Sequence, residues 1–223
     1  LYQWLGIRQE PTPEHVISRI RKLTASPRDD SSQKTIEKIF DYLSQRWPQY
    51  DESERNRFAA LKQLPWLPGN RDLQAWYLPE HVYAVFQKYL FETQANFLDL
   101  PDSLQRRASQ LIRFLDIPTV PPPELVVRHL KECSQKQQPV NNEVYRFLND
   151  NKDDPAIAEL REIPCILLRS DGADEYVRPT QVFWDEHPFG PFRYQLGSSL
   201  REYQGLFDAL GCLLYTSPSP RDS

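Results

Sequence analysis

The chain has 223 residues, of which 39% are hydrophobic and 26% charged, a composition typical of a folded protein with a well-solvated surface. Its net charge of −4 provides no general attraction for nucleic acid or an anionic membrane, and no apolar run approaches the roughly 20 residues that span a bilayer. The first residues also lack the pattern of a secretory signal. We therefore expect no membrane partner, and we do not expect nucleic acid as the main partner.

The first predicted elements in chain order are helices. Thr-Pro-Glu at residues 12–14 predicts a helix start, because a hydroxyl cap, an early proline and a first-turn carboxylate all stabilise a helix N-terminus. A second helix is predicted over about residues 32–47, and Pro48 ends it. Residues 51–54 read Asp-Glu-Ser-Glu, a capping box that predicts a third, shorter helix.

Two short strands are predicted next, over residues 64–68 and 74–79, around a turn at Gly69-Asn70. Their prolines confine them to edges or strand ends, so any sheet is small. Apolar spacing then predicts one helix over residues 82–90 and another over residues 103–115.

The second half of the chain repeats this order. Residues 5–23 align with residues 115–133 with six identities in nineteen positions, and further matched groups follow in sequence as far as Leu206. Asp171-Gly172 stands where a hairpin turn is expected. Chance similarity between short apolar helices is the alternative. We predict an α+β, predominantly α-helical fold of two tandem units, each with several helices and a small β-hairpin.

The predicted boundaries place the first unit, truncated at its beginning, in residues 1–110. The second unit takes residues 111–211 and includes the start of a third at Leu210-Gly211. Residues 212–223 resemble a translated sequencing-library adaptor, and the alternative is a natural disordered tail rich in serine and proline. The chain contains no methionine, which suits an internal fragment.

The three cysteines, Cys133, Cys165 and Cys212, are odd in number and widely spaced. This pattern does not suit a disulfide framework or a zinc cluster. Free thiols in a reducing compartment fit better, and we expect a cytoplasmic location.

One motif bears on nucleotide binding. Glu92 and Asn96 have the E-x-x-x-N spacing by which Bergerat-fold ATPases hold magnesium. Such a pocket also needs D-x-G-x-G and a glycine-rich lid, because the backbone must approach the nucleotide closely. The seven glycines of the chain fit neither pattern. We therefore predict a solvated helix face here and no bound cofactor.

The histidines do not predict a metal site, because they are far apart and form no H-x-x-x-H pair: His15, His81, His129 and His187. His129 and Cys133 stand four residues apart on a predicted helix and could touch. A catalytic pair would also need an orienting group and an oxyanion site, for which no candidate is evident. We therefore predict packing for this pair, and no catalytic residues in the chain.

The remaining candidates have structural explanations. Asp29-Asp30 and Asp153-Asp154 flank or interrupt helices and are predicted as caps and loop residues. The basic residues of the two repeated helices favour a solvated face over a phosphate-binding strip: Arg19, Arg21, Lys22, Arg128 and Lys131. The aromatic residues beside the hairpins are predicted mainly as core, with any exposed one a partner anchor: Trp47, Trp66, Trp76, Tyr77 and Trp184.

Several motifs, in order, resemble the internal-repeat regions of sacsin-type proteins. They are L-G-I-x-x-x-P-T-P-E-x-V-I-x-x-I at residues 5–20, L-P-W-L-P at 64–68 and L-P-E-H-V-Y at 78–83, with I-P-C-I at 163–166 and R-P-T-Q-V-F at 178–183 in the second copy. In that family, an N-terminal Bergerat-fold ATPase domain, related to heat-shock ATPase chaperones, precedes long repeat segments. The resemblance covers nearly all of residues 1–211.

The resemblance implies a non-catalytic repeat segment of an ATPase chaperone, which positions or holds a protein client. ATP and magnesium would then be bound only by a domain upstream, and neighbouring repeat units of the parent chain would be further partners. Two alternatives remain. One is a generic helical-repeat scaffold for protein interaction, and the other is an accessory domain of a nucleic-acid-processing protein.

Overall fold

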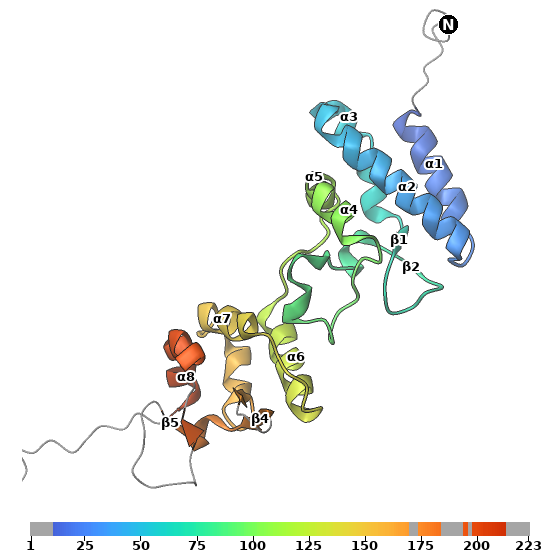
Figure 1. The fold of residues 1–223 in the computed structure, drawn as a ribbon. Helices are drawn as coiled ribbons and strands as arrows, with labels where there is room; N and C mark the ends of the chain where they lie inside the picture. Colours follow the sequence, from blue (N-terminus) through green and yellow to red (C-terminus); the bar gives the residue numbers. More distant parts are fainter. Residues whose placement is uncertain (1–10, 170–173, 184–193, 196–197, 213–223) are drawn as a thin grey trace, which may run out of the picture. The chain divides into compact units, whose positions relative to one another are not determined.

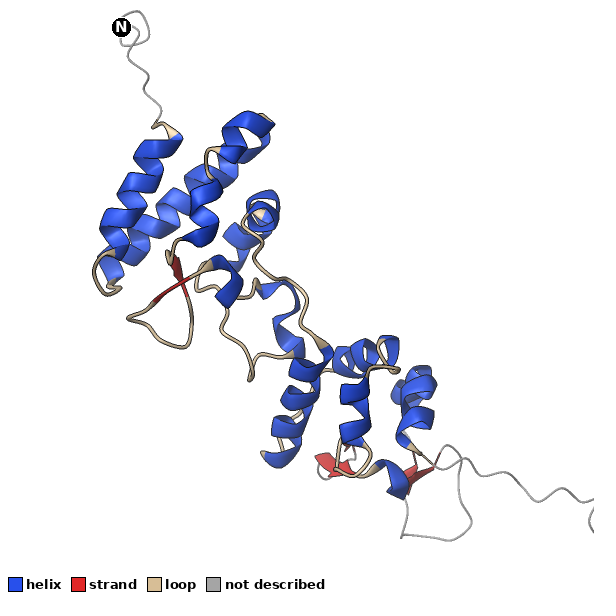
Figure 2. Ribbon diagram, turned by 180° about the vertical axis from the view of Figure 1, so that it is seen from behind, coloured by secondary structure: helices blue, strands red, loops and turns tan. Residues whose placement is uncertain are grey.

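The structure is a computed structural model, and it describes residues 11–169, 174–183, 194–195 and 198–212 (Figure 1). Several sequence-predicted features lie outside these residues, namely the first six residues of the repeated stretch, the turn at Asp171-Gly172, Trp184 and His187. The fold is α+β and predominantly helical, with small two-stranded sheets (Figure 2). This confirms the predicted fold class.

The chain forms two compact units. Unit 1 comprises Leu1–Lys88 and Ala95–Val120, and unit 2 comprises Tyr89–Gln94 and Pro121–Ser223. The division therefore falls after Val120 and not after residue 110 as predicted. The reason is that the helix which follows residue 108 buries its apolar side chains in the core of unit 1, as Leu111 and Ile112 show.

Unit 1 begins with a pair of helices, α1 (Pro13–Thr24) and α2 (Asp30–Arg46), which lie side by side in Figures 1 and 2. Each helix starts at a side-chain cap. Thr12 accepts a hydrogen bond from His15 N, and Asp29 and Ser32 form a reciprocal capping box. The predicted starts are thus confirmed to within two residues.

Three short helical elements follow: η1 (Trp47–Gln49), α3 (Glu52–Asn56) and η2 (Ala59–Gln63). Asp51 and Glu54 form the capping box that the sequence predicts, with Asp51 Oδ1 accepting from Glu54 N at 2.8 Å. The single helix expected here is therefore two short pieces.

The predicted hairpin is present and small. Strands β1 (Leu67–Pro68) and β2 (Trp76–Tyr77) pair antiparallel, with Leu67 opposite Tyr77. The prolines at the strand ends keep the pairing this short. The 3-10 turn η3 (Pro79–His81) follows.

The helix predicted over residues 82–90 is wrong. Only η4 (Val85–Leu90) forms, and it is kinked at Gln87, where φ is −126° and ψ is 30°. Two backbone N–H groups near the start of the predicted helix bond to acceptors that are distant in sequence. Ala84 N donates to Pro118 O at 3.0 Å, and Val85 N donates to the Gln105 side chain at 3.1 Å.

The last helix of unit 1 is broken in two, α4 (Asp102–Arg107) and α5 (Ser109–Phe114), where the sequence predicts one helix over 103–115. The break is at Ala108, whose ψ of 16° departs from helical geometry. Gln105 on α4 is fully buried and donates to Leu98 O and Leu100 O. Both helices contact α2. The core of unit 1 includes Ile20, Ile36, Phe40, Leu43, Trp66 and Leu111.

Unit 2 repeats the order. A helix pair, α6 (Pro123–Gln135) and α7 (Asn142–Asp150), is followed by η5 (Pro155–Leu160). Strands β3 (Ile166–Arg169) and β4 (Asp174–Val177) then form an antiparallel hairpin. The unit continues with η6 (Pro179–Gln181) and a parallel pair of strands, β5 (Val182–Phe183) and β6 (Tyr194–Gln195). It ends with η8 (Ser198–Tyr203) and α8 (Gln204–Leu210). Each unit therefore has its own helices and its own antiparallel hairpin.

Two buried contacts fix unit 2. The Tyr145 hydroxyl donates to Cys165 O at 2.9 Å and accepts from Leu167 N at 2.8 Å, so α7 is tied to the hairpin. At the other end, α8 stops at Gly211, which adopts a φ of 88°. Cys212, the first residue of the predicted tail, is buried, and its N–H donates to Phe207 O.

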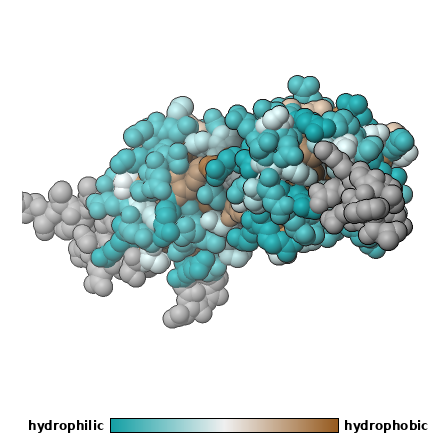
Figure 3. Space-filling view, turned by 90° about the horizontal axis from the view of Figure 1, so that it is seen from above, coloured by the Kyte–Doolittle hydropathy of each residue, from teal (hydrophilic) through white to brown (hydrophobic). Residues whose placement is uncertain are grey.

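Hydrophilic side chains cover most of the face in Figure 3, with apolar groups in small areas between them. Among the described residues, the large hydrophobic side chains that stand exposed are Leu73, Tyr89 and Val120. No described helix has both the length and the apolar character required to cross a membrane.

Candidate functional site

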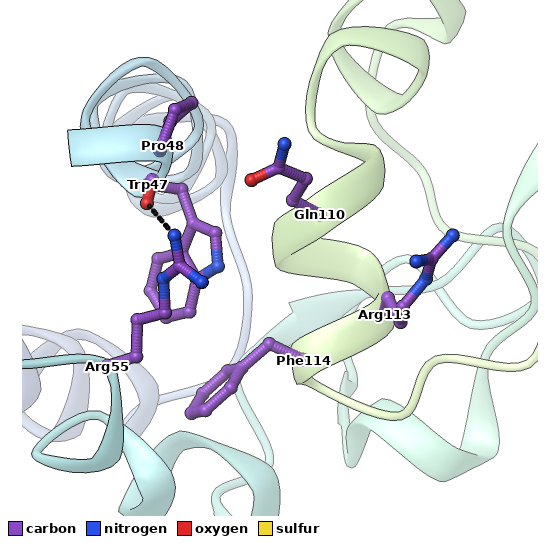
Figure 4. A pocket seen from close by; sticks show the side chains of 6 residues that line it. All are labelled: Trp47, Pro48, Arg55, Gln110, Arg113 and Phe114. Atoms are coloured by element: carbon purple, nitrogen blue, oxygen red, sulfur yellow. Dashed lines mark hydrogen bonds between the residues drawn. The ribbon is translucent and has the colours of Figure 1, made fainter. Parts of the chain in front are cut away.

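A pocket of about 570 Å³ opens in unit 1, where η1, α3 and α5 approach one another (Figure 4). We call it the Trp47 pocket, and its lining residues are Trp47, Pro48, Arg55, Gln110, Arg113 and Phe114. These residues come from segments about 60 positions apart, which α2 and its contacts with α5 bring together. None of the six lining residues is acidic.

Aromatic side chains form the base of the Trp47 pocket. Trp47 is 2% exposed, and its ring centroid lies 4.7 Å from that of Phe114 and 5.6 Å from that of Phe58. Pro48 follows Trp47 at the point where α2 gives way to η1, because proline cannot continue the α-helical hydrogen bonding. The same cluster includes Tyr50, and burial raises the pKa of Tyr50 to about 12, so its phenol stays neutral.

Arg55 lies over the buried indole side of the pocket. Its Nη2 donates to Trp47 O at 3.2 Å, the dashed line of Figure 4. Its Nε is buried and has no hydrogen-bond partner among the described residues. An unpaired buried donor costs free energy, so Arg55 has hydrogen-bonding capacity that the chain itself does not use.

The opposite wall comes from α5. Gln110 points toward Trp47 and Pro48, Phe114 points toward Arg55, and Arg113 points away from Trp47 (Figure 4). The side chain of Arg113 is exposed and makes no hydrogen bond or ion pair with any residue that the structure describes. The pocket therefore has one cation, Arg55, against its aromatic base, and a second, Arg113, at its outer edge.

The side chain of Lys62 covers one face of the Phe114 ring. Lys62 Nζ lies 4.8 Å from the centre of the ring and 2.7 Å from Asp116 Oδ2. This cation–π contact adds to the positive character beside the pocket, although Asp116 offsets part of it.

In the part of unit 2 that the structure describes, the matching helices pack in a different way. The repeat alignment that pairs Ile39 with Val144 pairs Trp47 with Lys152, and the alignment of α5 with α8 pairs Gln110 with Gly205. A Cβ on Gly205 would lie 3.0 Å from Lys152 Nζ and 3.1 Å from Asn149 Oδ1. The glycine thus lets α8 approach side chains that occupy this space, so the Trp47 pocket is a feature of unit 1.

Glu92 and Asn96 do not stand on a helix, which corrects the predicted solvated helix face. Glu92 lies in a turn and is exposed, while Asn96 Oδ1 accepts from Arg71 N at 3.1 Å. The two residues belong to different units. The spacing in the sequence therefore has no counterpart in a common site, because the helix that would align the two side chains is absent.

The predicted contact between His129 and Cys133 is present in unit 2. Cys133 Sγ lies 3.7 Å from His129 Nε2, and His129 Nδ1 lies 2.9 Å from Thr93 Oγ1. These residues border a second pocket of about 510 Å³, with Tyr89 and Glu92 at its edge.

The two groups are not poised for nucleophilic chemistry. Burial lowers the pKa of His129, and burial raises the pKa of Cys133, with the nearby Glu132 and Glu92 raising it further. A thiolate–imidazolium pair needs shifts in the opposite directions. The pair is held as a neutral imidazole and a protonated thiol, and it contributes packing.

The other histidines are dispersed. His15 and His81 are exposed and belong to unit 1, and His187 lies outside the described residues. Within the described ranges, no group of three or more His, Cys, Asp or Glu side chains is placed to hold a metal ion.

The remaining charged candidates have local roles. Asp29 caps α2, and Asp154 caps η5 through Ala156 N at 2.9 Å. Lys131 on α6 forms an ion pair with Glu159, while Arg128 is exposed. On α1, Arg19, Arg21 and Lys22 are all exposed.

The described aromatic candidates are buried or half-buried, and none of them is exposed. Trp66 is fully buried and its Nε1 donates to Leu61 O, whereas Trp76 and Tyr77 are half-buried. Sequence analysis singled out Trp47 but missed Arg55, Gln110 and Arg113. The repeat alignment contains a difference that marks this pocket. One copy has Trp47 and Gln110 where the other has Lys152 and Gly205.

Comparison of the chain with known protein families, curated proteins and solved structures finds no match in any of the three. The arguments about function therefore come from the residues and their arrangement.

Proposed function

We propose that the chain is a non-catalytic repeat segment of a sacsin-like ATPase chaperone, where it provides a binding surface for a protein client or partner. In this proposal ATP and magnesium are bound by a domain upstream in the parent protein, and neighbouring repeat units are further partners. The setting is cytoplasmic, in keeping with three free, buried cysteines.

The Trp47 pocket carries this proposal. It is an open, aromatic-based pocket with two arginines in its lining, and Trp and Arg are the residue types that contribute most to protein–protein binding. Elsewhere, burial lowers the pKa of His129 and raises the pKa of Cys133, which disfavours the thiolate–imidazolium pair of an activated cysteine. A surface that binds and does not react agrees with both observations.

Client holding can be tested with the full chain and citrate synthase that is diluted from denaturant. We expect the chain, at equimolar amounts, to lower the light scattering of the aggregating enzyme without added ATP, and to release no phosphate from ATP. Scattering that is unchanged at a large excess of the chain would refute client holding. Phosphate release that survives further purification would refute the non-catalytic assignment.

The upstream reading frame tests the link to an ATPase. A Bergerat-fold domain there, with E-x-x-x-N and D-x-G-x-G, is the expected result. Its absence would leave a generic helical-repeat scaffold as the better description.

One observation favours the accessory domain of a nucleic-acid-processing protein as a second candidate. Arg19, Arg21 and Lys22 on α1 are exposed and make no ion pair with any described residue. Binding through such a face loses affinity steeply as salt rises. Filter binding of single- and double-stranded DNA across a salt series would support this candidate if retention is salt-sensitive, and would remove it if no retention occurs at low salt.

A further inference from the structure

We propose that the Trp47 pocket binds an extended segment of a partner protein in which one large apolar side chain is flanked by Asp or Glu residues. This inference rests on the partner-binding function proposed above and specifies the chemistry of the partner. The pocket would take one such segment per chain.

The charges of the pocket select for an acidic partner. Arg55 lies against the aromatic base, Arg113 lies at the outer edge and points away from Trp47, and no lining residue is acidic. Arg55 is held in place by its hydrogen bond to Trp47 O, and its buried Nε still has no acceptor among the described residues. A carboxylate in the pocket would form a charge-assisted hydrogen bond with the Arg55 guanidinium, which lines the pocket.

The apolar part of the partner follows from what lies between the two arginines. Pro48 is exposed and Phe114 is half-buried, and together they offer apolar surface at the opening, above the buried Trp47. A large apolar side chain placed there removes both surfaces from water, which is the main favourable contribution to association. A carboxylate on one side of it then lies beside Arg55, and the exposed charge of Arg113 at the outer edge attracts a second one.

A peptide suits this geometry better than nucleic acid, although both are anionic. Nucleobases bind by stacking on open aromatic faces. Trp47 is only 2% exposed, and Lys62 covers a face of Phe114. The pocket therefore offers cations and an apolar opening, but only the half-buried Phe114 ring, with one face covered, for a base to stack on.

The stoichiometry follows from the comparison of the two units. The matching space in unit 2 is taken by Lys152 and Asn149, which lie against Gly205. Asn149 Oδ1 also accepts from Leu206 N at 2.9 Å, which fixes α8 at this approach. Among the described residues of unit 2, this space is filled, so we expect the site in unit 1 alone.

The test uses the full chain and a short fluorescein-labelled peptide with a central Phe between Asp and Glu residues. Fluorescence anisotropy should show saturable, salt-sensitive binding with one site per chain. Two matched peptides, one with Lys in place of the acidic residues and one with Ser in place of Phe, should each bind at least roughly tenfold more weakly, because each loses one part of the recognition.

Two variants locate the site. Arg113→Glu should weaken binding about tenfold, because it replaces a partly screened attraction with a repulsion. The matched control is Arg106→Glu, which reverses an exposed charge on α4 outside the pocket and should leave the affinity within about twofold. Gln110→Trp should abolish binding by filling the pocket, and because Gln110 is exposed the variant should fold as the wild type does by circular dichroism.

The inference is overturned if the acidic peptide binds no better than its lysine counterpart, or if the Arg113 and Arg106 reversals weaken binding equally. It is also overturned if a labelled single-stranded oligonucleotide binds with the same dependence on Arg113 and Gln110.

These outcomes are separate from a failure of client holding. If citrate synthase is still protected while the peptide does not bind, only the pocket assignment fails. If the peptide binds and the enzyme is not protected, the chain is a scaffold and the pocket assignment stands.

Discussion

Arg28 lies in the connection between α1 and α2, and its side chain is 2% exposed. Its Nη1 donates to Gly69 O and its Nη2 to Asp99 Oδ2, each at 2.7 Å. One buried guanidinium thus joins the start of α2, the hairpin loop and the segment before α4. We predict that Arg28→Ala destabilises unit 1 substantially, although Arg28 is far from the Trp47 pocket in sequence.

The magnitude follows from what the substitution leaves behind. The carbonyl of Gly69 loses its donor in a buried position, which costs about 1–3 kcal/mol. Removing one partner of a fully buried ion pair costs about 3–5 kcal/mol, but Asp99 is 38% exposed and can be hydrated, so we count only a fraction of that figure. The free energy of unfolding of unit 1 should fall by about 2–4 kcal/mol.

Urea unfolding followed by tryptophan fluorescence measures this change, because Trp47, Trp66 and Trp76 all belong to unit 1. With a urea dependence of about 1–2 kcal/mol per molar, the midpoint should fall by about 1–4 M. The control is Arg57→Ala. Arg57 pairs with Glu14 at 2.8 Å, but these side chains are 45% and 61% exposed.

Exposed ion pairs contribute little because water already solvates both charges. Arg57→Ala should therefore leave the urea midpoint unchanged within error. Equal shifts for Arg28→Ala and Arg57→Ala would contradict the reasoning, since the two pairs have similar distances and differ in burial. A shift of less than about 0.5 M for Arg28→Ala would also contradict it.

Three further predictions concern single positions. Gly69→Ala should destabilise unit 1 by about 1–3 kcal/mol in urea unfolding, because the new Cβ would lie 2.4 Å from Asn96 Nδ2. Unit 2 should lose stability as the pH falls from 7.5 to 5.5, since burial lowers the pKa of His129 and the unfolded chain takes up a proton first, near pH 6.5. Tyr145→Phe should lower the free energy of unfolding of unit 2 by about 1–3 kcal/mol, because Leu167 N loses a buried acceptor.

Each of these has a matched control. Gly205→Ala meets the flexible end of Lys152 and should cost less than Gly69→Ala. His129→Gln should remove most of the pH dependence of unit 2 in that range, and an undiminished dependence would point to another group. Tyr89→Phe, at a side chain that is 39% exposed, should change stability little, so an effect equal to that of Tyr145→Phe would contradict the role of the buried hydroxyl.

The sequence predicts helix starts well in this chain. Thr12, Asp29 and Asp51 each bond to a backbone N–H three residues later. Such a contact lies within one turn of the chain, so the sequence alone contains both partners. For the same reason the prolines beside β1 and β2 correctly predict a short hairpin.

The sequence fails where distant partners compete with local ones. Residues 82–90 have apolar spacing typical of a helix, yet Val85 N bonds to Gln105, twenty residues away. The helix predicted over 103–115 breaks at Ala108, which is 1% exposed in the core. The periodicity of apolar residues indicates which side chains are buried. It does not indicate which backbone N–H groups bond to residues that are remote in sequence.

The sequence by itself determined the helix starts, the hairpins and the two-unit plan, because these depend on neighbours within a few residues or on comparison of one half of the chain with the other. Only the tertiary structure decided that Gln110 and Phe114 on α5 face Trp47 at the end of α2. It also decided that Lys152 and Asn149 lie against Gly205 in the matching space of unit 2. The physical reason is that a pocket is the space left when packed helices meet, and their separation depends on side chains from segments that are remote in sequence.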